Sequence, residues 1–258
     1  MRLKSLVTMC RHSALNLEGI MDDLEDLALT PTPSAARPLL GLTVLVVEDS
    51  RFACEAMRLL CLRSGARIRR ADCLRSARRH LQVYRPSVAI VDLGLPDGDG
   101  ADLIEEMVEA TPRIGVVLGI SGDDQAEDIA LKAGADDFML KPISSLTLFQ
   151  TTILGLLPEE RQPSGPRPAN LDRVQPDRMA YQDDMALIAD MLGGDTDETT
   201  LDYVAQFLAG VARSADDVPL YDAAQTLSGL RRRGEPAVSQ AAHVAGLVQA
   251  RLSRPMAI

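Results

Sequence analysis

The chain has 258 residues, a net charge of −10 and an apolar fraction of 46%. It holds no apolar run near the ~18 to 20 residues of a membrane-spanning helix, and no signal-peptide pattern at its start. The acidic balance and the aromatic content of 3% argue against general nucleic-acid binding, which needs basic and aromatic side chains. The four cysteines form no C-x-x-C pair, which is typical of reduced thiols. We therefore expect a cytoplasmic protein without a disulfide framework or zinc site.

Residues 1–38 begin with apolar side chains at helical spacing between Leu3 and Leu27, with acidic residues on the opposite face, and end in a proline-rich stretch. This pattern predicts an amphipathic helix followed by a linker. The acidic face would be repelled by anionic lipid, so docking or homodimerisation is the expected role. His12, with Asn16 four residues later, faintly resembles a kinase phosphoacceptor helix. No ATP-binding domain accompanies it, so a solvated helical histidine is favoured.

Residues 41–157 alternate strand and helix patterns. Strands are predicted at 43–47, 66–70, 87–91, 114–120 and 137–140, and helices at 51–63, 73–84, 101–110, 125–133 and 145–157. Gly65 and Gly134 follow two of these helices as C-terminal stops. Right-handed crossovers then predict an α/β domain with a doubly wound, five-stranded parallel sheet.

The rest of the chain changes in character. Residues 158–178 are rich in proline and read as a linker. Residues 179–258 show no strand signal and fit helices at about 179–192, 198–212, 220–232 and 237–254. A separate, all-α output or docking domain is the expectation for this region.

Acidic residues follow two of the predicted strands directly. Glu48 and Asp49 come after the apolar run 44–47, and Asp92 comes after the run 88–91. Parallel strands end at the same edge of a sheet, so these carboxylates should converge. Crowded carboxylates repel one another unless a cation neutralises them, and Mg²⁺ prefers such oxygen ligands. The sequence therefore predicts a magnesium site.

Two further strands contribute phosphate-binding groups. Ser121 ends one strand and offers a hydroxyl donor, and Lys141 ends another and offers a compact positive charge. Asp92 is then the expected nucleophile, which would form an acyl phosphate. Each residue also has a plainer explanation: Asp92 or Asp49 could cap a helix, Ser121 could serve a turn, and Glu48 could be a solvated rim residue.

Glu48-Asp49, Asp92 with Pro96 and Gly98, Ser121-Gly122 and Lys141-Pro142 together resemble the receiver domain of two-component response regulators. The resemblance covers about 41–157 and implies a flavodoxin-like fold. It implies that Asp92 takes phosphate from a phosphohistidine on a histidine kinase or a histidine phosphotransfer protein. Mg²⁺ would be held by Asp49 and Asp92, with help from Glu48 and the backbone carbonyl of Gly94. Ser121 and Lys141 would contact the phosphoryl group. Phe138 matches the family's switch aromatic, with ordinary core packing as the alternative.

The C-terminal region carries weaker signals. Residues 224–229 resemble the motif of histidine phosphotransfer domains, but Gln225 and Ser228 stand where that motif has His and Lys. His243 is the other candidate, although the spacing after it is one residue short and a helical core or surface histidine is favoured. Residues 231–233 are a run of arginines, more consistent with a solvated helix end than with a DNA-recognition helix. A degenerate bundle used for docking or dimerisation is the favoured interpretation.

The residues of the predicted site are compared with three classes of function. The first is a phosphoacceptor switch in a phosphorelay that changes protein–protein interactions, which is not an enzyme in the ordinary sense. The second is a phosphatase of the haloacid type, disfavoured because Gly94 stands where that class needs a second aspartate. The third is a transcriptional regulator whose C-terminal DNA-binding module escapes recognition by sequence.

Overall fold

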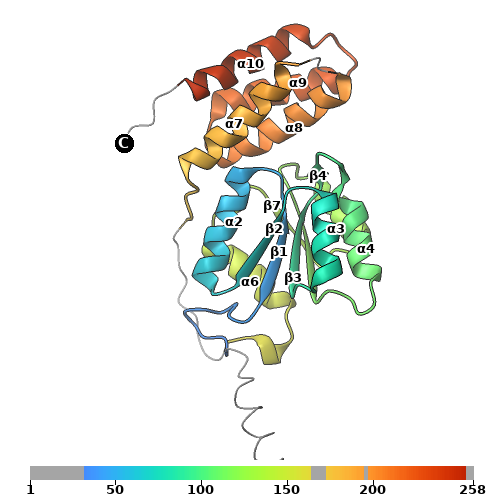
Figure 1. The fold of residues 1–258 in the computed structure, drawn as a ribbon, viewed down its shortest axis with the longest axis vertical. Helices are drawn as coiled ribbons and strands as arrows, with labels where there is room; N and C mark the ends of the chain where they lie inside the picture. Colours follow the sequence, from blue (N-terminus) through green and yellow to red (C-terminus); the bar gives the residue numbers. More distant parts are fainter. Residues whose placement is uncertain (1–31, 164–172, 195–196, 254–258) are drawn as a thin grey trace, which may run out of the picture.

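The computed structural model describes residues 32–163, 173–194 and 197–253. The predicted N-terminal helix, with His12, lies outside these residues and stays a prediction. Within them, no helix is both long and apolar enough to span a membrane. The described chain forms an α/β unit and, beyond it, a group of four helices (Figure 1).

Five parallel strands form the main sheet, in the order β2–β1–β3–β6–β7. Their bounds are Thr43–Val47 (β1), Arg67–Ala71 (β2), Val88–Asp92 (β3), Val116–Ser121 (β6) and Asp137–Leu140 (β7). This confirms the predicted doubly wound, flavodoxin-like α/β fold. The central strand β3 is buried along its whole length, because helices cover both faces of the sheet. The edge strand β2 instead exposes most of its residues.

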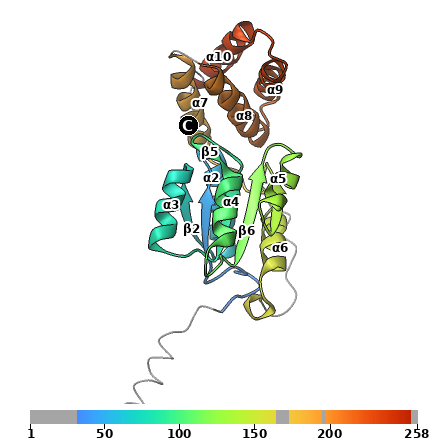
Figure 2. The same ribbon diagram turned by 90° about the vertical axis from the view of Figure 1, so that its right-hand side faces the viewer.

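Helices cover both faces of this sheet. On one face lie α2 (Arg51–Ser64) and α6 (Leu146–Leu156), and on the other lie α3 (Leu74–Val83), α4 (Gly100–Glu109) and α5 (Ala126–Lys132). Each face has its own buried cluster, with Met57 and Phe149 in the first and Leu103 and Ile104 in the second. Figure 2 shows α3, α4 and α5 side by side over the second face.

Several local features fix the ends of these elements. Ser50 caps α2, since its side chain accepts a hydrogen bond from the amide of Ala53. Gly65 ends the same helix at φ 84°, a left-handed conformation that favours glycine. A small antiparallel hairpin of β4 (Gly94–Leu95) and β5 (Gly98–Asp99) follows β3. The sequence did not predict this hairpin, because two-residue strands carry no periodic pattern.

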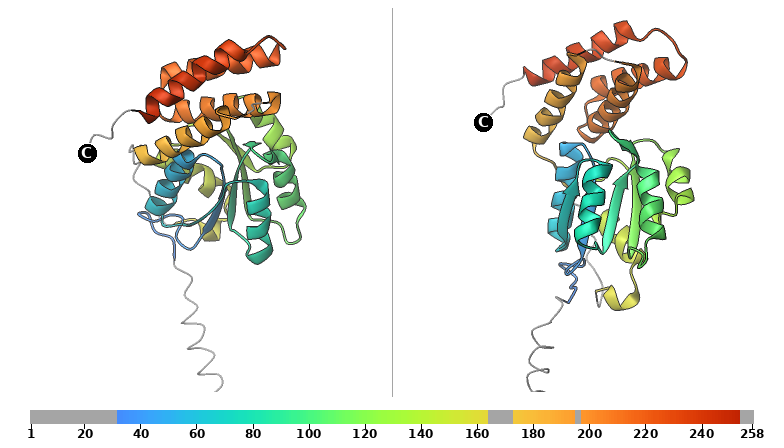
Figure 3. Two further views of the ribbon diagram at one scale, coloured as in Figure 1. Left: turned by 45° about the horizontal axis from the view of Figure 1, so that its top comes forward. Right: turned by 45° about the vertical axis from the view of Figure 1, so that its right-hand side comes forward.

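The C-terminal region is all-α, as predicted. It contains α7 (Arg178–Leu192), α8 (Glu198–Ser214), α9 (Val218–Arg232) and α10 (Val238–Leu252), which we call the helical bundle. Its own cluster of buried side chains includes Ile188, Leu208 and Leu227. Figures 1 and 3 show the bundle above the carboxyl ends of the strands, with α7 and α8 facing the α/β unit.

Part of the segment between the sheet and the bundle packs on the α/β unit. A 3₁₀ turn forms at Glu159–Arg161, and Arg173 makes an antiparallel bridge with Ser145. The amide of Val174 donates to the carbonyl of Ser144 at 2.9 Å, and the Val174 side chain is buried in the α2–α6 cluster. This end of the predicted linker therefore packs on the α/β unit. The domain limits 1–38, 41–157, 158–178 and 179–258 themselves stay predictions.

Candidate functional site

Three carboxylates meet at the carboxyl edge of the sheet. Glu48 and Asp49 follow β1, and Asp92 is the last residue of β3, the neighbouring strand. One carboxylate oxygen from each lies within 4.8 Å of those of the other two. Glu48 and Asp92 are buried, whereas Asp49 is half-buried. The predicted convergence is therefore found, and the cluster is of a kind that could hold a metal ion.

Lys141 supplies the positive charge of this cluster from the end of β7. Its ammonium nitrogen lies 2.6 Å from Glu48 Oε2 and 2.9 Å from Asp92 Oδ2. The other Glu48 oxygen accepts a hydrogen bond from the amide of Ser50 at 3.2 Å. Lys141 therefore pairs with two carboxylates. Asp49 adds a third carboxylate, so the cluster has more negative than positive groups.

Burial and repulsion set the protonation of these groups. Burial raises the pKa of Glu48 well above its usual range, and the charges of Asp92 and Asp49 raise it further against the attraction of Lys141. Burial, with the charge of Asp92, raises the pKa of Asp49 to about 6. Burial lowers the pKa of Lys141, but Asp92 and Glu48 outweigh it, so that the net pKa lies above the ordinary value. The carboxylates therefore need more positive charge than Lys141 provides.

The donor set fits a hard divalent cation. It is made of carboxylate oxygens, which Mg²⁺ prefers, and the negative charge is only partly balanced. Glu48 Oε2 is buried and has its ion pair with Lys141 but no hydrogen bond of good geometry. The two carboxylates that would bind the ion most directly, Asp49 and Asp92, come from adjacent strands.

Ser121 and Gly94 line the same cavity as the three carboxylates and Lys141. Ser121 is buried at the end of β6, and its hydroxyl oxygen accepts a hydrogen bond from the amide of Asp123 at 3.1 Å. The backbone of Lys141 is tied to that of Ser121, because its amide donates to the Ser121 carbonyl at 2.8 Å. The sheet register thus places Ser121 and Lys141 next to each other in the backbone, and both residues line the cavity.

Phe138 lies in β7 and is half-buried. It packs against the cluster of α3, α4 and α5, and its ring passes close to Gly119 of β6, where a Cβ would lie 3.4 Å from Phe138 Cδ2. This placement fits core packing and equally fits an aromatic that rotates. Its role as a switch stays a prediction.

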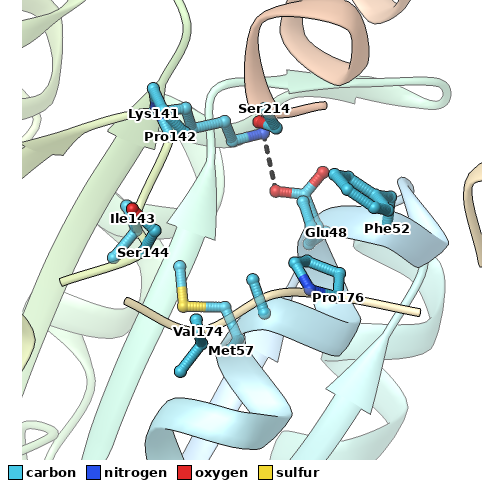
Figure 4. Close-up of a pocket in the computed structure, with 12 residues that line it drawn as sticks. Glu48, Phe52, Met57, Lys141, Pro142, Ile143, Ser144, Val174, Pro176 and Ser214 are labelled. Carbon is cyan, nitrogen blue, oxygen red and sulfur yellow. Dashed lines mark ion pairs between the residues drawn. The ribbon is translucent and has the colours of Figure 1, made fainter. Parts of the chain in front are cut away.

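A second, more apolar cavity adjoins the site. Met57 and Phe52 of α2, Ile143 and the returning residues Val174 and Pro176 line it. Figure 4 shows the Glu48–Lys141 ion pair at one side of this cavity, with Ser214 of α8 above it. The C-terminal end of the predicted linker thus forms part of the wall next to Lys141.

The bundle contributes side chains to the site that the sequence did not predict. Tyr203 of α8 donates its hydroxyl to Asp49 Oδ2 at 2.6 Å. Gln206, one turn later, lies so close to Gly94 that a Cβ on that glycine would be 2.1 Å from Gln206 Nε2. Gln206, Gly210, Val211 and Ser214 line the carboxylate cavity. No local motif marks these residues, because their importance comes only from docking across the chain.

Asp184 of α7 ties the bundle to the start of α2. It is almost completely buried, and its carboxylate accepts hydrogen bonds from the Ser50 hydroxyl at 2.8 Å and from the amides of Arg51 and Phe52 at 2.8 and 3.1 Å. The next residue back, Asp183, pairs with the Arg51 side chain at 2.9 Å. A carboxylate from one part of the chain therefore caps a helix of another.

The other residues singled out in the C-terminal region lie away from this cavity. His243 and Gln225 are exposed on α10 and α9. Arg231 pairs with Asp202 at 2.8 Å, and Arg233 pairs with Glu235 at 2.6 Å. The structure places neither His243 nor the arginine run at the site. The resemblance of the bundle to a phosphotransfer domain stays unconfirmed.

Comparison with known proteins identifies the α/β unit. Residues 44–152 match the family model described as the response regulator receiver domain. The α/β unit is therefore similar to the receiver domains of response regulators. Two curated relatives are the KDP operon transcriptional regulatory protein KdpE of Escherichia coli, 33% identical over 99 residues, and the transcriptional regulatory protein CitB of Klebsiella pneumoniae, 36% identical over 107 residues.

These matches cover only part of each protein. The aligned residues make up 38% of this chain and 44% of KdpE, and 40% of this chain and 45% of CitB. The chain thus spans less than half the length of the curated relatives it matches. Among solved structures, a response regulator from Chloroflexus aurantiacus aligns with 44% of this chain and 98% of its own, at 27% identity and a TM-score of 0.41.

Proposed function

We propose that this chain is a phosphoacceptor switch of a two-component phosphorelay, in which Asp92 accepts a phosphoryl group from a phosphohistidine on a partner protein. The observation that carries the proposal is the meeting of Glu48, Asp49, Asp92 and Lys141 at one edge of the sheet. The family match of residues 44–152 supports it. The expected donor is a histidine kinase or a histidine phosphotransfer protein.

Each residue has a distinct role in this proposal. A carboxylate oxygen of Asp92 attacks the phosphorus in line with the leaving imidazole nitrogen. Lys141, already 2.9 Å from Asp92 Oδ2, neutralises charge on an equatorial oxygen of the phosphoryl group. The Ser121 hydroxyl donates to another of these oxygens. When bound, Mg²⁺ would supply the remaining positive charge, held by Asp49, Asp92 and the Gly94 carbonyl, with Glu48 beside it.

Phosphorylation would be read out through a change of shape. The ammonium of Lys141 would exchange its contact with Asp92 for one with the phosphoryl group, and the Ser121 hydroxyl would move toward it. Phe138 of β7, whose ring lies near Gly119 of β6, would rotate with that movement. The outcome of phosphorylation would be a changed affinity for a protein partner. We therefore do not class the chain as an enzyme that acts on a separate substrate.

Labelling with a small phosphodonor tests this function. The full chain, incubated with Mg²⁺ and acetyl phosphate, should gain one phosphoryl group that alkali removes, as expected of an acyl phosphate. The Asp92→Ala variant should gain none, whereas Asp99→Ala, a change at an exposed aspartate of the β4–β5 hairpin, should label like the wild type. Equal labelling of the wild type and Asp92→Ala would reject Asp92 as the acceptor.

The names of the curated relatives raise transcriptional regulation as a second function. The match to the receiver family model ends at residue 152, before the bundle begins. The arginines of the 231–233 run that pair in the structure do so with acidic side chains. Nothing in the described residues favours a DNA-binding surface on the bundle. The proposed output is therefore a protein–protein interaction.

A further inference from the structure

We propose that the receiver face around Asp92 is a docking surface shared by two helical occupants. In the structure α7 and α8 of the same chain occupy it, and the phosphohistidine partner must use it in their place. The bundle would thus act as a cover that limits which donors reach Asp92. This inference rests on the proposed function of Asp92 and adds that the chain controls its own access to phosphate.

The bundle contacts the receiver on two opposite sides of the cavity that contains Asp92. Asp184 binds the start of α2 on one side of the cavity. Arg213 of α8 reaches the other side, where it donates to the carbonyl of Gly122 at 2.6 Å. Tyr203 binds Asp49 between them. Because contacts lie on both sides of Asp92 and α8 lines the cavity, α8 covers Asp92. Figure 2 shows α8 above the ends of the strands.

The space left above Asp92 is small. The cavity lined by Asp92, Lys141, Gln206 and Gly210 has a volume of about 30 Å³. A water molecule needs about 10 to 15 Å³ on the same measure, so the cavity has room for about two waters. An imidazole ring carrying a phosphoryl group, attached to a protein helix, does not fit there while α8 is in place.

The chemistry of transfer requires that space. The Asp92 oxygen forms its bond to phosphorus while the bond from phosphorus to the imidazole nitrogen breaks, and the electron pair returns to that nitrogen. The two bonds lie roughly in line, so the donor ring must stand opposite Asp92, on the solvent side of the cavity. Gln206 and Gly210 of α8 line that side. The covering helix and the donor histidine therefore compete for one place.

The contacts of the cover suit reversible docking. They include hydrogen bonds of Asp184 and Arg213 with the receiver backbone and the ion pair of Arg51 with Asp183. Phe52 provides an apolar anchor, with its ring edge-on to Tyr181 at 5.8 Å. Polar interfaces between parts of one chain commonly open and close. The bundle has a buried core of its own, into which Phe52 of α2 also packs.

Hydrogen exchange of the full chain tests whether the cover is closed in solution. The first amides of a helix have no partner within the helix and normally exchange fast. The amides of Arg51 and Phe52 should exchange slowly here, because they donate to Asp184. Their slow exchange should persist in Tyr181→Phe, which changes a tyrosine whose hydroxyl binds Asp217 within the bundle. Fast exchange at both amides in the wild type would overturn the inference.

Labelling rates test whether the cover limits access. Asp184→Ala removes the hydrogen bonds to α2 and should raise the rate of labelling by phosphoimidazole by about ten-fold, with a smaller increase for Tyr203→Phe. Labelling by the smaller donor phosphoramidate should change less, and Tyr181→Phe should match the wild type with both donors. Equal rates for the wild type and both opening variants would reject the cover as a barrier.

These measurements separate the cover from the proposed function. If no protein in the series labels at all, the proposed function of Asp92 fails, while hydrogen exchange still shows whether the cover is closed. If all these proteins label with phosphoramidate and the opened variants label faster than the wild type with phosphoimidazole, both the function and the cover are supported. Circular dichroism and thermal unfolding of Asp184→Ala would show that the bundle is still folded, and Tyr203→Phe, which keeps its ring, provides a second variant.

Discussion

The hydroxyl of Tyr203 lies 2.6 Å from Asp49 Oδ2, although the two residues are 154 positions apart in the sequence. Asp49 belongs to the carboxylate cluster, and Tyr203 belongs to the helical bundle. This hydrogen bond lowers the pKa of Asp49, but burial and the charge of Asp92 outweigh it, so that the pKa is raised to about 6. The Tyr203 hydroxyl thus stabilises part of the negative charge of Asp49, which a bound cation would also stabilise.

Asp49→Asn should stabilise the protein in the absence of Mg²⁺. The substitution removes one of three crowded carboxylates and keeps an oxygen that can accept the Tyr203 hydrogen bond. We expect a gain of about 1 to 2 kcal/mol in the free energy of unfolding near neutral pH. Urea unfolding with and without Mg²⁺ checks this, because Mg²⁺ should stabilise the wild type and have little effect on the variant. A loss of stability in Asp49→Asn without Mg²⁺ would show that repulsion between these carboxylates does not destabilise the protein.

Lys141→Ala should destabilise the protein. It leaves the carboxylates of Glu48 and Asp92 buried without their common partner, and breaking a buried pair costs about 3 to 5 kcal/mol. We expect a loss near the lower value, because Glu48 can take up a proton. Mg²⁺ should still bind and should raise the melting temperature of the variant more than that of the wild type. A variant that Mg²⁺ does not stabilise would show that Lys141 is needed to form the site.

Gly100→Ala should distort the loop that carries Asp92. A Cβ at Gly100 would lie 2.0 Å from the backbone oxygen of Asp92, and neither backbone can move freely. We expect a loss of more than about 2 kcal/mol, typical of overpacking against backbone. The matched control is Gly155→Ala in α6, where a Cβ meets no atom within 4 Å. There, the higher helix propensity of alanine should raise the free energy of unfolding by about 0.5 to 1 kcal/mol. Similar stabilities of the two variants in thermal unfolding would contradict the structure at this loop.

The Asp217–Arg251 pair should make the bundle sensitive to acid. The Arg251 guanidinium, 2.7 Å away, lowers the pKa of Asp217 to about 2. A carboxyl with a lowered pKa in the folded state stabilises the protein above its unfolded pKa of about 3.9, and this contribution is lost as the pH falls toward 2. Asp217→Asn should therefore cost about 1 kcal/mol at pH 7, since the pair is partly exposed.

Unfolding at pH 7 and at pH 2 to 3 measures this effect. The difference in stability between the wild type and Asp217→Asn should shrink across the interval from about pH 4 to pH 2. A difference that stays constant over that range would mean that Asp217 acts through packing or backbone capping rather than through its charge.

Much of the α/β unit could be predicted from the sequence because its signals are local. Buried runs such as 44–47 and 88–91 are short and β-branched, and they end in charged residues, so strand, strand end and site residue can be read together. The register of the sheet then places Asp92 beside the end of β1, and Lys141 beside Ser121, as expected from their positions at strand ends. The predicted limits differed by one or two residues at β2 and β6.

The cover could not be predicted in this way. Asp184, Tyr203 and Arg213 have no motif in common, and in sequence they are ordinary residues of amphipathic helices. Their contacts with Ser50, Asp49 and Gly122 span more than 90 positions and depend on how two folded units dock. The return of Val174 to the α2–α6 cluster was hidden for the same reason, because a proline-rich stretch carries no signal of the surface it packs on.

Identification of the modified residue tests the central claim most directly. The full chain would be labelled with acetyl phosphate and Mg²⁺ and then reduced with borohydride, which converts an aspartyl phosphate to homoserine, and its peptides would be mapped by mass spectrometry. The account predicts homoserine at position 92 in the labelled protein and none in an unlabelled sample. A phosphoryl group found instead on His243 or any other residue, with Asp92 unmodified, would contradict it.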